Sequence, residues 1–143
     1  FLVLGASVGA AGTAPAKEVK IRWLGQSMFE IVTPKGTSIY TDPHNIEAYR
    51  IKTGGFKADL VLMSHFHSDH TSLEPFSNKD ALTKAGAVIN ALKTAGEPKR
   101  IVWNDVDRDF KDVHIRTVGT FHDTARGFMR GPNGCSGAGA SLA

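Results

Sequence analysis

Three imidazoles and one carboxylate are crowded into residues 65–70, which read HFHSDH. An apolar run without polar alternation, residues 60–63, precedes them. Such a run, bounded by polar residues, predicts a short strand buried on both faces. In α/β sheets ligand sites gather at strand ends, so these side chains stand where a binding site is expected.

The spacing of these side chains indicates metal binding. In an extended segment residues i and i+2 lie on one side, so His65 and His67 are predicted to bind one metal together. Asp69 continues that face and His70 is expected to point elsewhere, which gives two clusters. Imidazole is a common metal ligand and carboxylate a frequent companion. The alternative is a set of solvated loop histidines, but packing alone has no use for such a cluster.

The motif H-x-H-x-D-H resembles the signature of the metallo-β-lactamase superfamily, and its match here is complete. The flanking sequence is similar to the branch that includes L-ascorbate-6-phosphate lactonase and related metal-dependent hydrolases. The resemblance covers residues 18 to 134. It implies an α/β (α+β) fold, namely half of an αββα sandwich with a mixed β-sheet and a flanking helix. The segments that carry the branch resemblance are 23–29 (WLGQSMF), 41–43 (TDP), 119–123 (GTFHD) and 130–133 (RGPN).

The resemblance implies a set of metal ligands. His65, His67 and His122 would form a three-His site with a fourth position for water, and Asp69 and His70 would begin a second site. Zn²⁺ is the expected metal, as one or two ions, and this ligand chemistry also suits Mn²⁺ or iron. Zinc lowers the pKa of bound water to about 7, which supplies hydroxide to attack a carbonyl or phosphoryl centre. Asp69 is the expected catalytic residue, since it also orients the nucleophilic water.

Other polar residues are assigned around this centre. Asp42 follows a predicted strand and is expected to accept a hydrogen bond from a ligand histidine, with an ordinary turn aspartate as the alternative. Asp123, Arg130 and Asn133 are weaker candidates for substrate binding, and a solvated loop explains them equally well. His44 is expected to be a loop residue.

The chain departs from a two-metal enzyme beyond the third ligand. A dinuclear member needs a bridging carboxylate and one more histidine there, whereas Asp123 is the last carboxylate and no histidine follows His122. The expected function is therefore a hydrolase of an ester, lactone or phosphoester that is inactive as this 143-residue chain. A non-catalytic remnant binding one metal is the alternative. A nucleic-acid-processing member lacks support, because no basic patch with interleaved aromatics occurs.

Composition limits the class of protein. The 143 residues are 41% hydrophobic and 22% charged, as expected for one soluble domain, and a net charge of +3 is too mild to indicate nucleic acid. The single cysteine, Cys135, excludes an internal disulfide and a cysteine-based zinc site. The expected partner is a small-molecule substrate. Self-association is also expected, because half a sandwich leaves one sheet face and its strand edges uncovered.

The two ends differ from the middle. Residues 1–16 resemble a secretory signal-peptide remnant, with cleavage after Ala16 and an exported or periplasmic product without a membrane anchor. A cytoplasmic location follows if that segment is an artefact. A glycine-rich nucleotide-binding turn is disfavoured there, because Pro15 stands where a helix should open. Residues 17–134 form the metallo-β-lactamase-like part, and 135–143 are a low-complexity, non-homologous tail.

Local patterns predict the elements that carry these residues. Alternation predicts a half-buried strand at 19–23 and another strand at 113–117, where His114 lies on the solvated face. A capping box at 77–80 predicts a helix whose apolar positions run from 81 to 92. The remaining predictions are strands at 28–32, 37–41 and 100–103, a turn at 33–36, a helical turn at 46–50 and a charged loop at 105–112.

Overall fold

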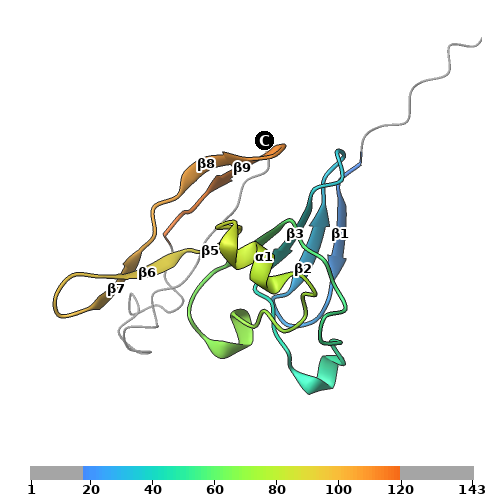
Figure 1. Ribbon diagram of the computed structural model, residues 1–143, viewed down its shortest axis with the longest axis horizontal. Helices are drawn as coiled ribbons and strands as arrows, with labels where there is room; N and C mark the ends of the chain where they lie inside the picture. Colours follow the sequence, from blue (N-terminus) through green and yellow to red (C-terminus); the bar gives the residue numbers. More distant parts are fainter. Residues whose placement is uncertain (1–17, 120–143) are drawn as a thin grey trace, which may run out of the picture.

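A computed structural model describes residues 18–119 of the chain (Figure 1). Most of the ordered elements in this part are short strands, and there is little helix. In chain order they are β1 Lys20–Trp23, β2 Phe29–Val32, β3 Ser38–Thr41, the 3₁₀ turn η1 Glu47–Tyr49, β4 Leu60–Met63, the 3₁₀ turn η2 Ser68–His70, α1 Lys79–Lys84, β5 Val88–Asn90, β6 Leu92–Ala95, β7 Arg100–Trp103, β8 Asp107–Phe110 and β9 Val113–Arg116.

Five strands form one mixed sheet in the order β1-β2-β3-β4-β5. The first three are antiparallel, and β3, β4 and β5 run parallel to one another. The predicted turn between β2 and β3 is confirmed, since the Gly36 amide donates to the Thr33 carbonyl at 2.9 Å. Gly36 has φ +88°, which a residue without Cβ adopts at no steric cost. The sequence-based prediction of a mixed sheet therefore holds.

The two faces of β3 and β4 contribute side chains to two separate hydrophobic cores. Tyr40, Val61 and Met63 face α1 and are buried with Leu82 of that helix. Because successive strand residues point to opposite faces, Leu60 and Leu62 of β4 lie on the other side. β4 is thus covered on both faces, as its unbroken apolar sequence predicted.

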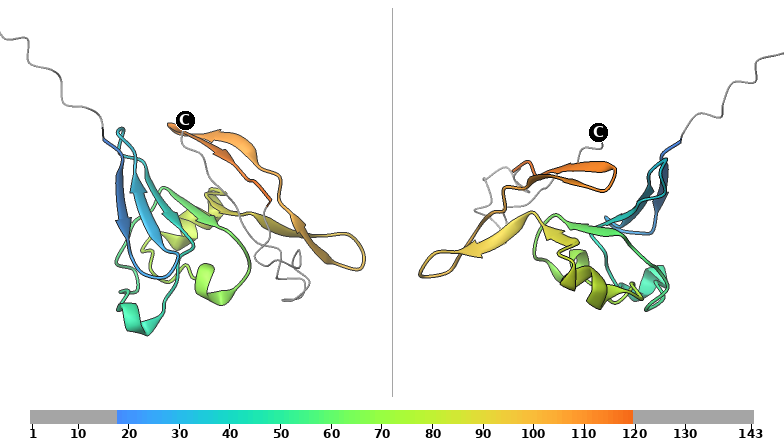
Figure 2. Two further views of the ribbon diagram at one scale, coloured as in Figure 1. Left: turned by 180° about the vertical axis from the view of Figure 1, so that it is seen from behind. Right: turned by 45° about the horizontal axis from the view of Figure 1, so that its top comes forward.

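The second face is covered by the β8–β9 hairpin. Val113 and Ile115 of β9 pack with Ile39, Leu60 and Ile89 of the sheet. Figure 2 shows this hairpin as a separate layer beside the sheet. The expectation that one face lacks cover is therefore wrong for β3 to β5, because a second pair of strands follows within the described residues.

The turn of that hairpin is anchored to the sheet by polar contacts. Asp112 accepts hydrogen bonds from the hydroxyls of Thr33 and Thr37, and these two contacts hold the pKa of its carboxyl below the ordinary value. Lys111 Nζ lies 2.6 Å from Asp59 Oδ1. Burial raises the pKa of Asp59, but hydrogen bonds from Lys111 and from the Ser38 amide outweigh it and lower the pKa.

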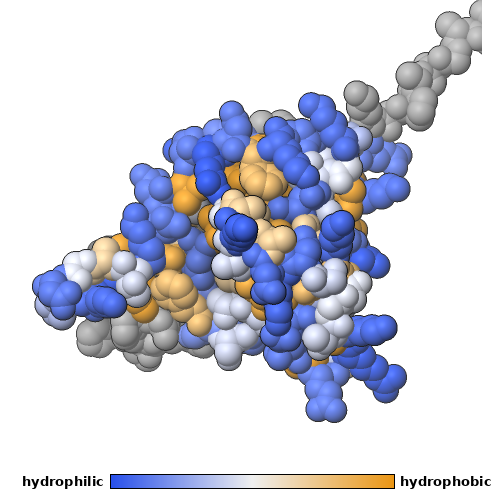
Figure 3. All heavy atoms as spheres, viewed as in Figure 1, coloured by the Kyte–Doolittle hydropathy of each residue, from blue (hydrophilic) through white to orange (hydrophobic). Residues whose placement is uncertain are grey.

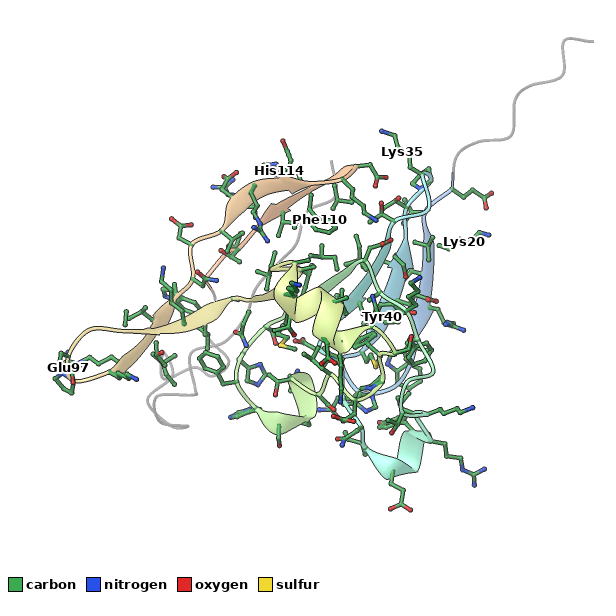
Figure 4. All side chains as sticks on the ribbon, in the orientation of Figure 1. Lys20, Lys35, Tyr40, Glu97, Phe110 and His114 are labelled. Atoms are coloured by element: carbon green, nitrogen blue, oxygen red, sulfur yellow. The ribbon has the colours of Figure 1, made fainter. Side chains whose placement is uncertain are left out.

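A buried tyrosine links the sheet to its polar edge. The Tyr40 hydroxyl donates to Glu30 Oε1 at 2.5 Å, and Glu30 Oε2 in turn pairs with Arg22 at 2.8 Å. Burial, together with the Glu30 carboxylate, raises the pKa of Tyr40 to about 12. Figure 4 shows Tyr40 beside α1 and Phe110 between the β8–β9 hairpin and the sheet.

The predicted long helix is wrong. α1 covers only Lys79–Lys84, and Gly86, at φ +62°, follows its end. Val88 and Ile89 then pair with β4 as β5, where β-branched side chains pack well. The predicted capping box is also absent, because the Ser77 hydroxyl donates to the Phe56 carbonyl instead of capping the helix. Asn78 precedes the helix, and its side chain bonds the backbone of Ala58.

Two further expectations are corrected. The charged loop at 105–112 contains β8, which pairs with β9. β1 is an edge strand whose side chains are exposed rather than half-buried, with Ile21 66% and Trp23 60% exposed. His114 lies on the outer face of β9, as predicted, where it contacts Asp107 and Asp109. The β6–β7 hairpin projects beyond β5, away from β1 (Figure 1).

The surface in Figure 3 is largely hydrophilic with scattered apolar side chains. Within residues 18–119 no helix has the length and apolar character needed to cross a membrane. The predictions for residues 1–16 and 135–143 fall outside the described residues.

Candidate metal centre

The carboxyl ends of three parallel strands meet at one edge of the sheet. Thr41 of β3 pairs with Leu62 of β4, and Met63 of β4 pairs with Asn90 of β5. The residues that follow these strands therefore emerge side by side. They are Asp42 after β3 and the HFHSDH loop, residues 65–70, after β4.

Asp42 connects the first two of these strand ends. Its amide donates to the Leu62 carbonyl at 2.8 Å, and its Oδ1 accepts from the Ser64 amide at 2.6 Å. Asp42 holds φ +39°, a conformation that aspartate tolerates better than most residues. The backbone just before the loop is thus fixed by a carboxylate from the neighbouring strand.

The structure brings His65 and His67 together. His65 is 2% exposed, and its Nε2 lies 2.8 Å from Nδ1 of His67. The other ring nitrogen of His65, Nδ1, lies 2.8 Å from the Ser64 hydroxyl oxygen. Two imidazole nitrogens therefore face each other at the distance of one hydrogen bond, as expected for side chains at i and i+2.

The loop does not stay extended beyond His67. Residues 68–70 form the 3₁₀ turn η2, which brings the His70 ring to 4.2 Å from the His65 ring, centroid to centroid. The expectation that His70 points elsewhere is therefore wrong. The two predicted clusters, one with His65 and one with His70, are in contact because the backbone turns into a 3₁₀ turn after His67.

His70 lies between two carboxylates. Its Nδ1 is 3.4 Å from Asp42 Oδ2 and its Nε2 is 3.6 Å from Asp69 Oδ2. Nδ1 is buried, yet it has no hydrogen-bond partner among the described residues, because the approach to Asp42 lacks the geometry of one. A buried polar atom without a partner is costly, and such atoms mark places built for something besides packing.

Three residues at this edge were missed or misjudged from the sequence. Gln26, in the turn between β1 and β2, donates from Nε2 to Asp69 Oδ2 at 2.6 Å. Asn90 donates to the His65 carbonyl at 3.3 Å and accepts from the Leu92 amide at 2.9 Å. His44 lies in the loop after β3, as expected, but its side chain is fully buried and bonds the Gly25 carbonyl at 3.0 Å. Only contacts between distant segments distinguish these residues from ordinary turn residues.

A small cavity of about 50 Å³ adjoins this edge. Its lining includes Asp42 and Ser64 from the sheet edge and Ile115 and Arg116 from β9. The cavity therefore lies between the sheet and the hairpin that covers it, directly beside the loop.

The donor chemistry suits a metal ion, although the described part does not complete a site. Within residues 18–119 no three His, Cys, Asp or Glu side chains are grouped closely enough to hold one. The donors come as pairs instead, His65 with His67 and His70 with Asp69. The predicted residues His122, Asp123, Arg130 and Asn133 lie outside the described residues. Facing imidazoles and the partnerless His70 Nδ1 are the features that fit a cation.

Comparison with known proteins gives a family match over most of the chain. The model of the Beta-lactamase superfamily domain matches residues 20–135. A UPF0173 metal-dependent hydrolase of Methanobrevibacter smithii is 46% identical over 54 residues, which are 36% of this chain and 23% of that protein. One of Koribacter versatilis is 42% identical over 55 residues, 36% of this chain and 24% of that protein.

A longer match is with a UPF0173 metal-dependent hydrolase of Thermodesulfovibrio yellowstonii. It is 32% identical over 90 residues, which are 57% of this chain and 34% of that protein. The chain thus spans about a quarter to a third of the length of the curated relatives it matches. No solved structure matches.

Proposed function

Since the chain belongs to the beta-lactamase superfamily, we propose that it carries the metal-binding residues of a metal-dependent hydrolase acting on an ester, a lactone or a phosphoester. The observation that carries this proposal is the pair of imidazole nitrogens, His65 Nε2 and His67 Nδ1, 2.8 Å apart at the carboxyl edge of the parallel strands. The relatives named metal-dependent hydrolases support the same reaction class.

The proposed ligands fall into two groups. His65, His67 and His122 hold the first ion, and Asp69 and His70 contribute to a second. We propose Zn²⁺, while the same ligand types also suit Mn²⁺ or iron. When bound, such an ion polarises a carbonyl or phosphoryl oxygen and makes water acidic enough to ionise near neutral pH.

The Ser64 hydroxyl prepares His65 for this role. A ligating imidazole must present a lone pair, and its second nitrogen then carries the proton. The Ser64 oxygen lies 2.8 Å from His65 Nδ1 and can accept that proton in a hydrogen bond. Nε2, the nitrogen that faces His67, is then free of its proton.

Asp42 and Asp69 place carboxylates on both sides of His70. Asp42 Oδ2 lies 3.4 Å from Nδ1 without the geometry of a hydrogen bond, and Nε2 faces the Asp69 carboxylate. We propose that Asp69, besides its part in the second group, accepts the proton of the attacking water at a carboxylate oxygen.

The finer parts of the proposal concern substrate and location. Arg116 in the cavity wall is a cation suited to an anionic substrate group, and Asp123, Arg130 and Asn133 are proposed to add to it. We propose that the sheet is one half of an αββα sandwich. The apolar, alanine-rich residues 1–16 support export.

Metal analysis of the purified chain after dialysis tests the proposal. We expect about one zinc or manganese ion per chain, as for a three-histidine site, and loss of that ion in His67→Ala. His114→Ala is the matched control, because this histidine lies on β9 with Asp107 and Asp109 as its partners. A folded chain without metal, or a His67→Ala variant that binds like the parent, would contradict the proposal. About two ions per chain would show instead that the second group is complete.

A further inference from the structure

The turn between β1 and β2 reaches into the candidate metal centre through one side chain. Gln26 Nε2 lies 2.6 Å from Asp69 Oδ2, a contact between residues 43 positions apart. An ionised carboxylate only accepts hydrogen bonds, so the amide nitrogen must be the atom that faces it. The contact is therefore a directed, charge-assisted hydrogen bond.

The backbone of Gln26 is held in place for this contact. Gln26 has φ +50°, in the left-handed region of backbone conformation, which residues other than glycine seldom adopt. The Trp23 indole Nε1 donates to the Gln26 carbonyl at 2.9 Å, and the Met28 amide closes the turn onto the Gly25 carbonyl at 2.9 Å. The direction of the Gln26 side chain is thus set by a turn whose backbone is hydrogen-bonded both before and after this residue.

Residues of the loop after β3 then hold this turn in place. The Ile46 amide donates to His44 Nδ1 at 3.2 Å, so Nδ1 is the acceptor of a neutral ring and Nε2 carries the proton. That Nε2 donates to the Gly25 carbonyl at 3.0 Å. The Tyr49 ring covers Gly25 so closely that a Cβ there would lie 2.3 Å from the ring.

We infer that Gln26 is a positioning residue that holds the carboxylate of Asp69 in a fixed orientation beside His70. The inference rests on the proposed function, because it assigns a purpose to that orientation. A turn that served packing alone would not need to direct an amide nitrogen at a carboxylate of the loop. Gln26 donates its hydrogen bond to Oδ2 of Asp69, so Oδ1 is the carboxylate oxygen that Gln26 leaves available.

The expected consequence is on the second ion, because Asp69 belongs to the second group of proposed ligands. Losing a partner that orients a ligand typically costs about 10–100-fold in metal affinity. Gln26→Leu keeps most of the side-chain volume and removes the donor. Ser27→Ala, which removes a hydroxyl from the same turn, is the matched control.

The experiment measures the affinity of the full 143-residue chain for Zn²⁺ by competition with a chromophoric chelator. It also records the visible spectrum of the Co²⁺-loaded chain, since cobalt bands report the geometry of the ligands. We expect Gln26→Leu to weaken binding of the second ion, which is titrated beyond one equivalent of metal, by about 10-fold or more and to change the cobalt spectrum. Ser27→Ala should match the parent in both measurements.

Thermal melting of the metal-free variants separates this role from a fold defect. If Gln26→Leu does not fold, Trp23→Phe removes the indole donor to the Gln26 carbonyl and should give a smaller loss of affinity in the same direction. Unchanged affinity and spectrum in a folded Gln26→Leu chain would overturn the inference and leave the proposed function standing. A parent chain that binds neither metal would overturn both.

Discussion

Gly25→Ala is the substitution for which the structure gives the most definite expectation. Gly25 is buried at φ +104°, a region that L-residues rarely adopt. A Cβ at this position would lie 2.3 Å from Cδ1 of Tyr49 and 2.5 Å from its Cγ. Both the backbone and the neighbouring ring therefore oppose a side chain there.

The expected loss in the free energy of unfolding has two parts. A non-glycine residue in a sparsely populated region costs about 1–3 kcal/mol. Overpacking costs about 1–3 kcal/mol more. Tyr49 is 42% exposed and can swing outward, so the steric part should stay near the lower end of its range. We expect Gly25→Ala to lower the free energy of unfolding by about 2–4 kcal/mol.

Gly36→Ala separates these two parts. Gly36 has φ +88° and no atom within 4 Å of an added Cβ, so this variant carries the backbone cost alone. Urea denaturation of both variants should place Gly25→Ala below Gly36→Ala by about 1–2 kcal/mol. Adding Tyr49→Ala to Gly25→Ala should abolish that difference, since it removes the ring atoms that the new Cβ meets. Equal losses in the two glycine variants would refute the close-packing argument.

Two further predictions concern the core and the hairpin. Leu60→Ala, at a fully buried position of β4, should lower the free energy of unfolding by about 2–5 kcal/mol, whereas Ile21→Ala on the exposed edge strand should change it by under about 1 kcal/mol; similar losses in a urea titration would contradict the assigned burial. The hydrogen bond that His114 Nδ1 donates to the Asp109 carboxylate, with the charge of Asp107, raises the pKa of His114 above 6.5. Its stabilising contribution is then complete below pH 6.5 and is lost as pH rises through the raised pKa. The stability gap between the parent and His114→Gln should therefore shrink toward alkaline pH, and a gap independent of pH would contradict the contact.

Local patterns predicted four of the five strands of the sheet, β1 to β4, and the turn between β2 and β3. These signals are contained in a few adjacent residues: an unbroken apolar run at 60–63, and a Pro–Gly turn at 33–36. The 3₁₀ turn at Glu47–Tyr49 also follows the prediction of a helical turn at 46–50. Where one short segment determines its own conformation, the sequence was sufficient.

The predicted helix failed because its apolar spacing suited two structures. Val88, Ile89 and Leu92 match helical spacing, but Gly86 ends α1 and β4 offers a parallel edge to pair with. Pairing with β4 involves residues 27 positions earlier, as in Val61 with Val88. No window of local sequence contains that partner.

The arrangement of the candidate site was only partly foreseen from the sequence. The spacing of His65 and His67 anticipated their contact, whereas the 3₁₀ turn that brings His70 against His65 broke the extended pattern. The buried state of His44 and the contact of Gln26 with Asp69 depend on the β1–β2 turn folding over the loop. A single histidine or glutamine in a polar segment carries no signal for such contacts.

The conformation of the backbone around the loop links this arrangement to the proposed chemistry. Gln26 and Asp42 both have positive φ, and both make their side-chain hydrogen bonds to the chain between Ser64 and Asp69. Such conformations cost about 1–3 kcal/mol each and persist only where surrounding contacts determine them. Here those contacts come from the sheet and from the buried His44, so the free energy of folding holds the loop in place. A loop oriented in advance loses less entropy when it binds an ion, which is what the proposed metal site requires of it.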